Sequence, residues 1–407
     1  MKNLAVTFVL LLLLNGCKNA DPVEPAMGVW RAELSVMDNQ LLPFNFKLLK
    51  SDSGKYMMEV YNAEEVINVD EIRVFNDSIV IKMPVYEGYM AGTFTKNEMK
   101  GKFIKESLDR IVPFTATFDA HSRFDTAAVA SGDVSGIWET RFNTNQEDEY
   151  IAKGIFKQKG NKVTGTFETT TGDYRYLDGV IDGDSLKVSA FDGAHAFLFT
   201  AKLKDSTLNG AFYSGNHSKE TMNAKRNESY ILPSADSLTF LKEGYEQLAF
   251  KFPDSEGNFI SLSDEQFQNK VVLIQIMGSW CPNCLDETKY YTQYLQDNPS
   301  SKLEIIALAF EYAKTQEKAF NSIKRLTDRI GVKYPVLLAQ YGTSDKEEAQ
   351  EKLPMLNHVL SYPTTIFVDK KGNVRKIHTG FNGPATGEKY ELFKTAFDKF
   401  VKQLLDE

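Results

Sequence analysis

Short runs in which apolar and polar residues alternate dominate the chain from Gly28 to about Asn227. A period of two is typical of strands that bury one face. Turn-forming segments such as Asp52-Ser53-Gly54 and Asp182-Gly183-Asp184 separate these runs. Strand-length runs at a spacing of about 8–12 residues predict an all-β region, either a sandwich or a barrel, without alternating helices.

Three matched segments indicate that the β region contains two related halves. The matches are 28–30 with 136–138 (offset 136 − 28), 78–81 with 185–188 (offset 185 − 78) and 99–103 with 208–212 (offset 208 − 99). Because the offsets are nearly constant, we expect a first β unit at residues 28–130 and a second at residues 131–227. Both units open with a Gly-x-Trp sequence, which resembles the first strand of lipocalin-like barrels but implies no ligand.

The pattern changes after a linker at residues 228–247, which we expect to be a short helix or an extended connection. Residues 271–277 form a continuous apolar run, as expected for a strand buried on both faces. A helical pattern then starts at Cys284 and continues to about Gln296. Further strands are expected at 303–310, 334–339, 364–369 and 374–379, and further helices at 315–330 and 388–405. This order predicts an α/β domain over residues 248–407, with helices covering a central sheet.

The first 17 residues have the pattern of an export signal. Lys2 precedes an apolar run from Leu4 to Leu14, which is too short to span a bilayer as a helix. The ending Leu14-Asn15-Gly16-Cys17 resembles the lipobox of bacterial lipoproteins, which implies a lipid on Cys17. A plain signal peptide with an incidental cysteine is the alternative. With residues 18–27 as a polar tether, we expect a lipid-anchored protein at the periplasmic face of a bacterial membrane.

Composition narrows the classes of function. A net charge of −8 and the lack of any Lys/Arg-rich run argue against nucleic-acid binding. With 42% hydrophobic and 25% charged residues, the chain is neither disordered nor a multi-span membrane protein. The sequence contains three cysteines, so that lipidation of Cys17 leaves only Cys281 and Cys284 to pair with each other.

The segment Trp280-Cys281-Pro282-Asn283-Cys284 lies where the predicted strand meets the predicted helix. A thiol at a helix N-terminus faces free N–H groups and the positive end of the helix dipole, which favour the thiolate. We therefore expect Cys281 to be an exposed nucleophile and Cys284 a buried resolving thiol. Their redox-active disulfide needs no other cofactor. Half of a zinc site and an inert disulfide are the alternatives, but zinc needs four ligands and the chain has no second cysteine pair, so we expect no metal.

This segment, together with the later run Tyr362-Pro363-Thr364-Thr365, resembles the thioredoxin superfamily, and most closely the TlpA-like and ResA-like disulfide reductases. The resemblance covers roughly residues 245–405 and predicts a thioredoxin-like domain. It implies that Pro363 is a cis-proline beside the dithiol. It also implies that Trp280, Tyr362 and Pro363 bind the substrate.

Two positions near the dithiol bear on proton transfer. Gln275 stands where thioredoxin itself has a buried aspartate, and a neutral amide cannot accept a proton from the resolving thiol. Glu287 matches an acidic residue of the TlpA-like and ResA-like reductases, so we expect it to tune the dithiol and relay its proton. A solvated acid favoured by the helix dipole is the alternative for Glu287, and it is the expected state of Asp286.

These features predict a thiol–disulfide oxidoreductase. A disulfide reductase for exported proteins is favoured because the Pro-Asn pair lacks the histidine that stabilises the thiolate of strong oxidants. Its partners would be a disulfide-containing protein and an upstream membrane or periplasmic thiol donor. One alternative is a redoxin-type thiol peroxidase, although Gly278 stands where such enzymes have threonine. The other is a binding protein whose β region is switched by the redox domain.

Overall fold

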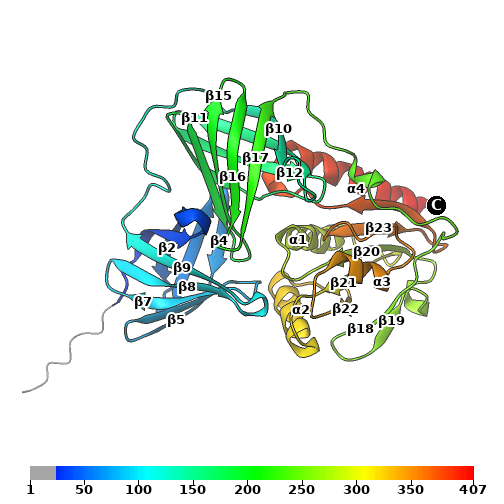
Figure 1. The fold of residues 1–407 in the computed structure, drawn as a ribbon. Coiled ribbons are helices and arrows are strands. Elements are labelled where there is room, and N and C mark those ends of the chain that lie inside the picture. Colours follow the sequence, from blue (N-terminus) through cyan, green and yellow to red (C-terminus); the bar gives the residue numbers. More distant parts are fainter. Residues whose placement is uncertain (1–23) are drawn as a thin grey trace, which may run out of the picture.

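The computed structural model describes residues 24–407 and shows two β units followed by an α/β domain (Figure 1). The predicted fold class, an all-β N-terminal region followed by a thioredoxin-like α/β domain, is confirmed. The predicted signal peptide with Cys17 and most of the predicted tether lie outside the described residues. Within residues 24–407, no helix combines the length and the apolar character needed to cross a bilayer.

The first β unit is a nine-stranded antiparallel sheet in which strands that follow one another in sequence pair, except β4 and β5. β1 also pairs with β9, while β4 and β5 form the two open edges. Alternate residues of β1 are buried, which explains the period of two in the sequence. The strands are β1 (Gly28–Ser35), β2 (Leu41–Lys50), β3 (Tyr56–Asn62), β4 (Glu65–Val69), β5 (Glu71–Phe75), β6 (Ser78–Lys82), β7 (Tyr89–Phe94), β8 (Glu98–Lys105) and β9 (Arg110–Phe118).

The second β unit is a closed eight-stranded barrel, in which β10 pairs with β17 to complete the ring. Its interior is filled by aromatic side chains, including Phe142, Phe167 and Phe199, none of which is exposed to solvent. The strands are β10 (Gly136–Phe142), β11 (Tyr150–Lys159), β12 (Lys162–Thr169), β13 (Leu177–Asp182), β14 (Ser185–Phe191), β15 (Ala196–Lys204), β16 (Thr207–Ser214) and β17 (Ser218–Arg226).

The tryptophans that open the two β units have the same environment. Trp30 and Trp138 are both fully buried. Each indole N–H donates to the carbonyl four residues earlier, Ala26 or Val134, at 2.9 Å. A buried indole with a satisfied N–H fixes the start of the first strand against the interior of its unit.

The α/β domain contains a five-stranded sheet in the order β22-β21-β20-β23-β24. Central β20 is buried at all seven positions, because β21 and β23 flank it and helices cover the sheet. The elements are β18 (Lys251–Pro253), β19 (Phe259–Ser261), β20 (Val271–Met277), α1 (Pro282–Asp297), β21 (Leu303–Phe310), α2 (Gln316–Ile330), β22 (Val336–Gln340), α3 (Lys346–Lys352), β23 (Thr364–Val368), β24 (Val374–Thr379) and α4 (Glu388–Asp406).

Helix α1 is held by aromatic contacts with α4. The ring of Phe397 lies 5.2 Å from that of Tyr290 and 5.3 Å from that of Tyr291, measured between ring centroids. Residues 228–247, expected to be a connecting helix or a linker, are mostly irregular, with one 3₁₀ turn at Ala235–Ser237. The three parts of the molecule meet around α1 (Figure 1).

Candidate active site

The dithiol lies at the first turn of α1, directly after the turn that follows β20. Cys281 is the N-cap of the helix, and its Sγ accepts a hydrogen bond from the backbone N–H of Cys284 at 3.2 Å. Pro282 occupies the first helical position, where its missing N–H leaves no carbonyl without a partner. Cys281 and Cys284 form a disulfide with their Cα atoms 5.2 Å apart, a separation that suits such a bond.

A second segment approaches the dithiol from β23. The Tyr362–Pro363 peptide bond is cis, as predicted. The carbonyl oxygen of Tyr362 lies 3.3 Å from the Sγ of Cys281, so it can accept the hydrogen of the reduced thiol. The Trp280 ring lies 5.6 Å from the Tyr362 ring, and its indole N–H donates to Phe310 at 2.9 Å. The structure thus brings the predicted substrate-binding residues Trp280, Tyr362 and Pro363 together beside Cys281.

Glu287 lies beneath the dithiol, on the same helix and fully buried. Burial raises the pKa of Glu287 to about 7, although hydrogen bonds to its carboxylate act in the opposite direction. The donors are Gln275 Nε2 at 2.9 Å, Thr365 Oγ1 at 2.9 Å and Tyr291 Oη at 3.0 Å. A solvated first-turn acid, the alternative at this position, is therefore excluded. A carboxyl group with a pKa near neutral can hold or release a proton there.

Cys284 is fully buried, as expected for a resolving thiol. Burial raises the pKa of its thiol well above the ordinary value, and the hydrogen bond to Cys281 and the charges on Cys281 and Glu287 act in the same direction. Cys284 therefore needs a proton acceptor before it can attack, and the acidic group of Glu287 is near enough for its charge to affect the thiol.

Glu311, which the sequence did not suggest, supports the turn before the dithiol. Its carboxylate accepts hydrogen bonds from the N–H and the Oγ of Ser279, both at 2.7 Å. Burial raises the pKa of Glu311 to about 7. The only signal in the sequence was an acidic residue directly after the apolar run 303–310, and that signal also fits an ordinary loop residue.

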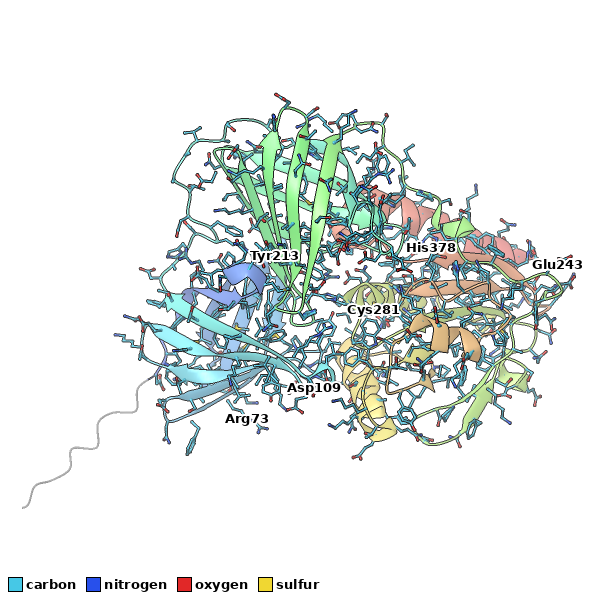
Figure 2. The ribbon with its side chains drawn as sticks, viewed as in Figure 1. Arg73, Asp109, Tyr213, Glu243, Cys281 and His378 are labelled. Atoms are coloured by element: carbon cyan, nitrogen blue, oxygen red, sulfur yellow. A yellow bond between two sulfur atoms is a disulfide. The ribbon has the colours of Figure 1, made fainter. Side chains whose placement is uncertain are left out.

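Two predictions about the exposure of the site are wrong. Cys281 was expected to be exposed, but only 6% of it is accessible, and its neighbour Asn283 is hydrogen-bonded to Asp173 in the connection between β12 and β13 of the barrel. Asp286 was expected to be a solvated acid, but it is 7% exposed and forms an ion pair with Arg175 of the barrel. Figure 2 accordingly shows Cys281 in the interior of the molecule, where the barrel approaches the α/β domain.

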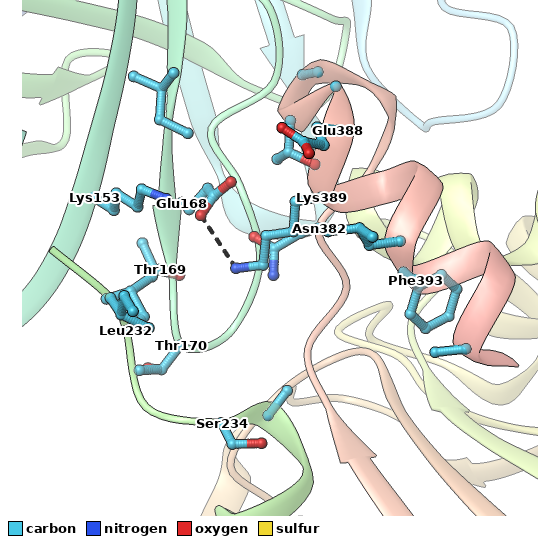
Figure 3. Close-up of a pocket in the computed structure, with 18 of the residues that line it drawn as sticks. Lys153, Glu168, Thr169, Thr170, Leu232, Ser234, Asn382, Glu388, Lys389 and Phe393 are labelled. Carbon is cyan, nitrogen blue, oxygen red and sulfur yellow. Dashed lines mark hydrogen bonds and ion pairs between the residues drawn. The ribbon is translucent and has the colours of Figure 1, made fainter. Parts of the chain in front are cut away.

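A cavity of about 880 Å³ lies on another side of the same barrel connection. Barrel strands, residues 231–236 and α4 line it, and Glu168 forms an ion pair with Lys389 across it at 3.1 Å (Figure 3). Neither cysteine lines this cavity. In the part of the chain from residue 24 onward, no group of three or more His, Cys, Asp or Glu side chains is arranged to hold a metal ion.

Comparisons with known proteins agree with this geometry. Residues 244–377 match the AhpC/TSA family. A thioredoxin-like protein, YneN of Bacillus subtilis, is 28% identical over 140 residues, which are 34% of this chain and 73% of that protein. The thiol-disulfide oxidoreductase ResA of Geobacillus kaustophilus is 26% identical over 32% of this chain and 66% of its own length. The thiol:disulfide interchange protein DsbE of Escherichia coli is 26% identical over 37% of this chain and 70% of its own length.

The family match falls on the α/β domain, which carries both cysteines and the cis-proline. Residues 244–377 therefore match the AhpC/TSA family and form a thioredoxin-like domain, and the chain is a thiol–disulfide oxidoreductase.

Proposed function

We propose that the protein is a disulfide reductase that acts on exported proteins. The observation that carries the proposal is the arrangement of Cys281 at the helix N-terminus, beside the cis-proline, with Cys284 buried behind it. The Pro-Asn pair between the cysteines provides no histidine to stabilise a thiolate, which favours a reducing role.

The reaction transfers two electrons from the dithiol to the substrate. The Cys281 thiolate attacks a substrate disulfide, so that a mixed disulfide forms and one substrate sulfur leaves as a thiolate, which takes up a proton. Cys284 loses its proton and attacks the Sγ of Cys281, which releases the second substrate sulfur. The protein is left with the Cys281–Cys284 disulfide, and a membrane or periplasmic thiol donor restores the dithiol by the reverse exchange.

Each neighbour of the dithiol has a role in this cycle. Glu287 accepts the proton of Cys284, directly or through a water molecule, because its raised pKa lies close to neutral. Trp280, Tyr362 and Pro363 form the surface that positions the substrate disulfide against Cys281. Export and lipid attachment through Cys17 would place this reaction at the periplasmic face of the membrane.

The test uses the reduced full-length chain and a model protein disulfide such as that of insulin. Cys281→Ser should abolish reduction, since no sulfur remains to make the first attack. Cys284→Ser should stop the cycle at the mixed disulfide, which mass spectrometry would detect as a covalent adduct on Cys281. Full reduction of insulin by Cys281→Ser would rule the proposal out.

A thiol peroxidase is the second candidate, because the family match is to AhpC/TSA proteins. The environment of Cys281 argues against it. A Cβ atom on Gly278 would lie 2.3 Å from Trp280 Nε1, so no hydroxyl-bearing side chain fits at the position that these enzymes use. Reduced protein should therefore consume hydrogen peroxide far more slowly than it reduces insulin. Faster peroxide consumption would reverse the choice.

A further inference from the structure

The barrel segment Thr171–Arg175, here called the strap, lies across the face of the α/β domain from which a substrate must reach Cys281. It contacts three segments of that domain: the first turn of α1, the residues before the cis-proline and the residues after β24. Asn283 Nδ2, between the two cysteines, donates to the carbonyl of Asp173 at 3.2 Å. Ser361 Oγ, just before the cis-proline, donates to the carbonyl of Thr171 at 2.9 Å. Gly172 forms a parallel β-bridge with Phe381.

The fit between the strap and the α/β domain leaves no space for another chain. A Cβ atom on Gly172 would lie 1.9 Å from Asn283 Nδ2. A Cβ atom on Gly380 would lie 2.6 Å from the carbonyl carbon of Thr171. Because even a methyl group is excluded at Gly172 and Gly380, no substrate segment can lie between the strap and the α/β domain while the strap is in place.

A buried network of charges holds the strap. Arg175 forms ion pairs with Asp286 of α1 and with Glu65 of β4, and the side chains of the three residues are 6%, 8% and 13% exposed. Asp173 accepts hydrogen bonds from the N–H groups of Arg175 and Gly383, at 2.8 and 2.6 Å. Arg175 therefore links both β units to α1. Removing it would leave buried carboxylates without a compensating charge, which is costly.

We infer that the strap determines which disulfides the dithiol can reduce. It occupies the substrate groove in the resting protein, and it must move aside before Cys281 can attack. Two of its backbone carbonyls bind Asn283 and Ser361, so these two side chains are donors for an extended peptide. The partner that fits is a protein presenting its disulfide on an extended segment, with a small residue at the position of Gly172.

This inference rests on the proposed function, and the test separates the two. The reduced full-length chain is treated with iodoacetamide at fixed pH, and modification of the Cys281 peptide is followed by mass spectrometry. Arg175→Ala leaves Glu65, Asp173 and Asp286 close together without their cation, so the strap should be released. Its Cys281 should be alkylated at least about tenfold faster than in the native chain.

Arg141→Ala is the matched control, because exposed Arg141 lies on the same barrel and pairs with half-buried Glu149 at 2.8 Å. Cys281 of the Arg141→Ala variant should be alkylated at the same rate as in the native chain. Gly383→Ala is the second opening variant: its backbone conformation suits alanine, and its Cβ would lie 2.8 Å from Asp286 Oδ2. It should also accelerate alkylation, and it keeps the inference testable if Arg175→Ala does not fold.

The outcomes are distinct. Unchanged alkylation in the folded opening variants, or native Cys281 that reacts as fast as a free exposed thiol, would overturn the role of the strap. If alkylation accelerates, insulin reduction by the opened variants tests the proposed function separately. Faster alkylation without insulin reduction would refute the reductase but leave the strap as a cover of Cys281.

Discussion

Residues 65–69 of the first β unit and residues 172–176 of the barrel occupy corresponding positions but have different structures. They are separated by an offset of 107 (172 − 65), which also relates Ser78 to Ser185 (185 − 78). In the first unit the segment is β4, which pairs with β3 and leaves the sheet open before β5. In the barrel the segment keeps only one antiparallel bridge to β12, between Asp173 and Glu168, so β13 pairs directly with β12 and the ring closes. One position in a repeated unit can therefore either extend a sheet or cover a neighbouring active site.

The two positions also contact the α/β domain differently. The barrel segment supplies buried Arg175, which pairs with Asp286 of α1. After β4, Asp70 and Glu71 instead pair with Arg329 of α2, at 2.5 and 2.8 Å, where Arg329 is 31% exposed. Buried and exposed ion pairs respond very differently when one partner is removed.

The largest expected effect is the difference between Arg175→Ala and Arg329→Ala in stability. Loss of Arg175 leaves buried carboxylates without their cation, so the free energy of unfolding should fall by about 3–5 kcal/mol. Loss of Arg329 should cost less than about 1 kcal/mol, because water solvates the remaining carboxylates. Urea denaturation followed by circular dichroism measures both. Equal losses would show that the two contacts are equivalent.

The next effect is the opposite pH dependence of Asp173 and Asp70. Burial raises the pKa of Asp173 to about 6, so the folded state favours its protonated form, and stability falls as the pH rises from about 4 to about 6. Asp173→Asn should remove this loss, of the order of 3 kcal/mol. Hydrogen bonding to Arg329 lowers the pKa of Asp70, so its contribution is present at neutral pH and lost in acid.

Denaturation curves of Asp173→Asn and Asp70→Asn at a series of pH values test this contrast. The Asp173 variant should lie closest to the native chain near pH 4 and diverge from it above pH 6. The Asp70 variant should differ most at neutral pH. Parallel curves for the two variants would contradict the assignment.

A comparison of Trp30 with Trp138 tests whether their matching hydrogen bonds stabilise the two β units to the same extent. Trp30→Phe and Trp138→Phe each remove an indole N–H and leave a carbonyl without its donor. The expected loss of stability is about 1–3 kcal/mol, larger for Trp138, whose hydrogen bond is buried while that of Trp30 is partly buried. Thermal unfolding of both variants shows which substitution causes the larger loss of stability. A larger loss at Trp30 would contradict it.

The smallest expected effect is a change in the pH dependence of Cys281 alkylation, which distinguishes covering of Cys281 by the strap from the influence of the Glu287 charge. Arg175→Ala should accelerate Cys281 alkylation at every pH. Glu287→Gln should instead change the alkylation rate of Cys281 only near pH 7 and above, where Glu287 of the native chain gains its charge. Alkylation rates between pH 5 and 9 measure both. An unchanged profile in Glu287→Gln would remove the role proposed for this residue.

Much of the α/β domain could be predicted because its signals are local. The apolar runs 271–277 and 303–310 became β20 and β21 with the predicted bounds, since strands buried on both faces need apolar residues throughout. The cis-proline and the helix that begins at the dithiol were also predicted correctly. Helix α3 was missed, because it is short and polar and buries only Ala349.

The cover over the dithiol could not be predicted, because it depends on contacts between distant parts of the chain. Asp286 and Arg175 are separated by 111 positions, and nothing near Asp286 in the sequence distinguishes it from an ordinary first-turn acid. For a similar reason, the sequence did not predict that the first β unit is an open sheet and the second a closed barrel. Whether residues 65–69 or 172–176 join a sheet depends on the partners that they meet in the folded chain.

Each of the three parts of the molecule carries one of the chain's three tryptophans. Trp30 and Trp138 are enclosed in the β units, whereas Trp280 is half-buried and adjoins the sulfur atoms. Replacing the first two by phenylalanine would leave Trp280 as the single tryptophan, whose emission depends on the dithiol and on the segment that lies over it. The protein thus contains a built-in optical reporter that could follow each turnover in real time without any added label.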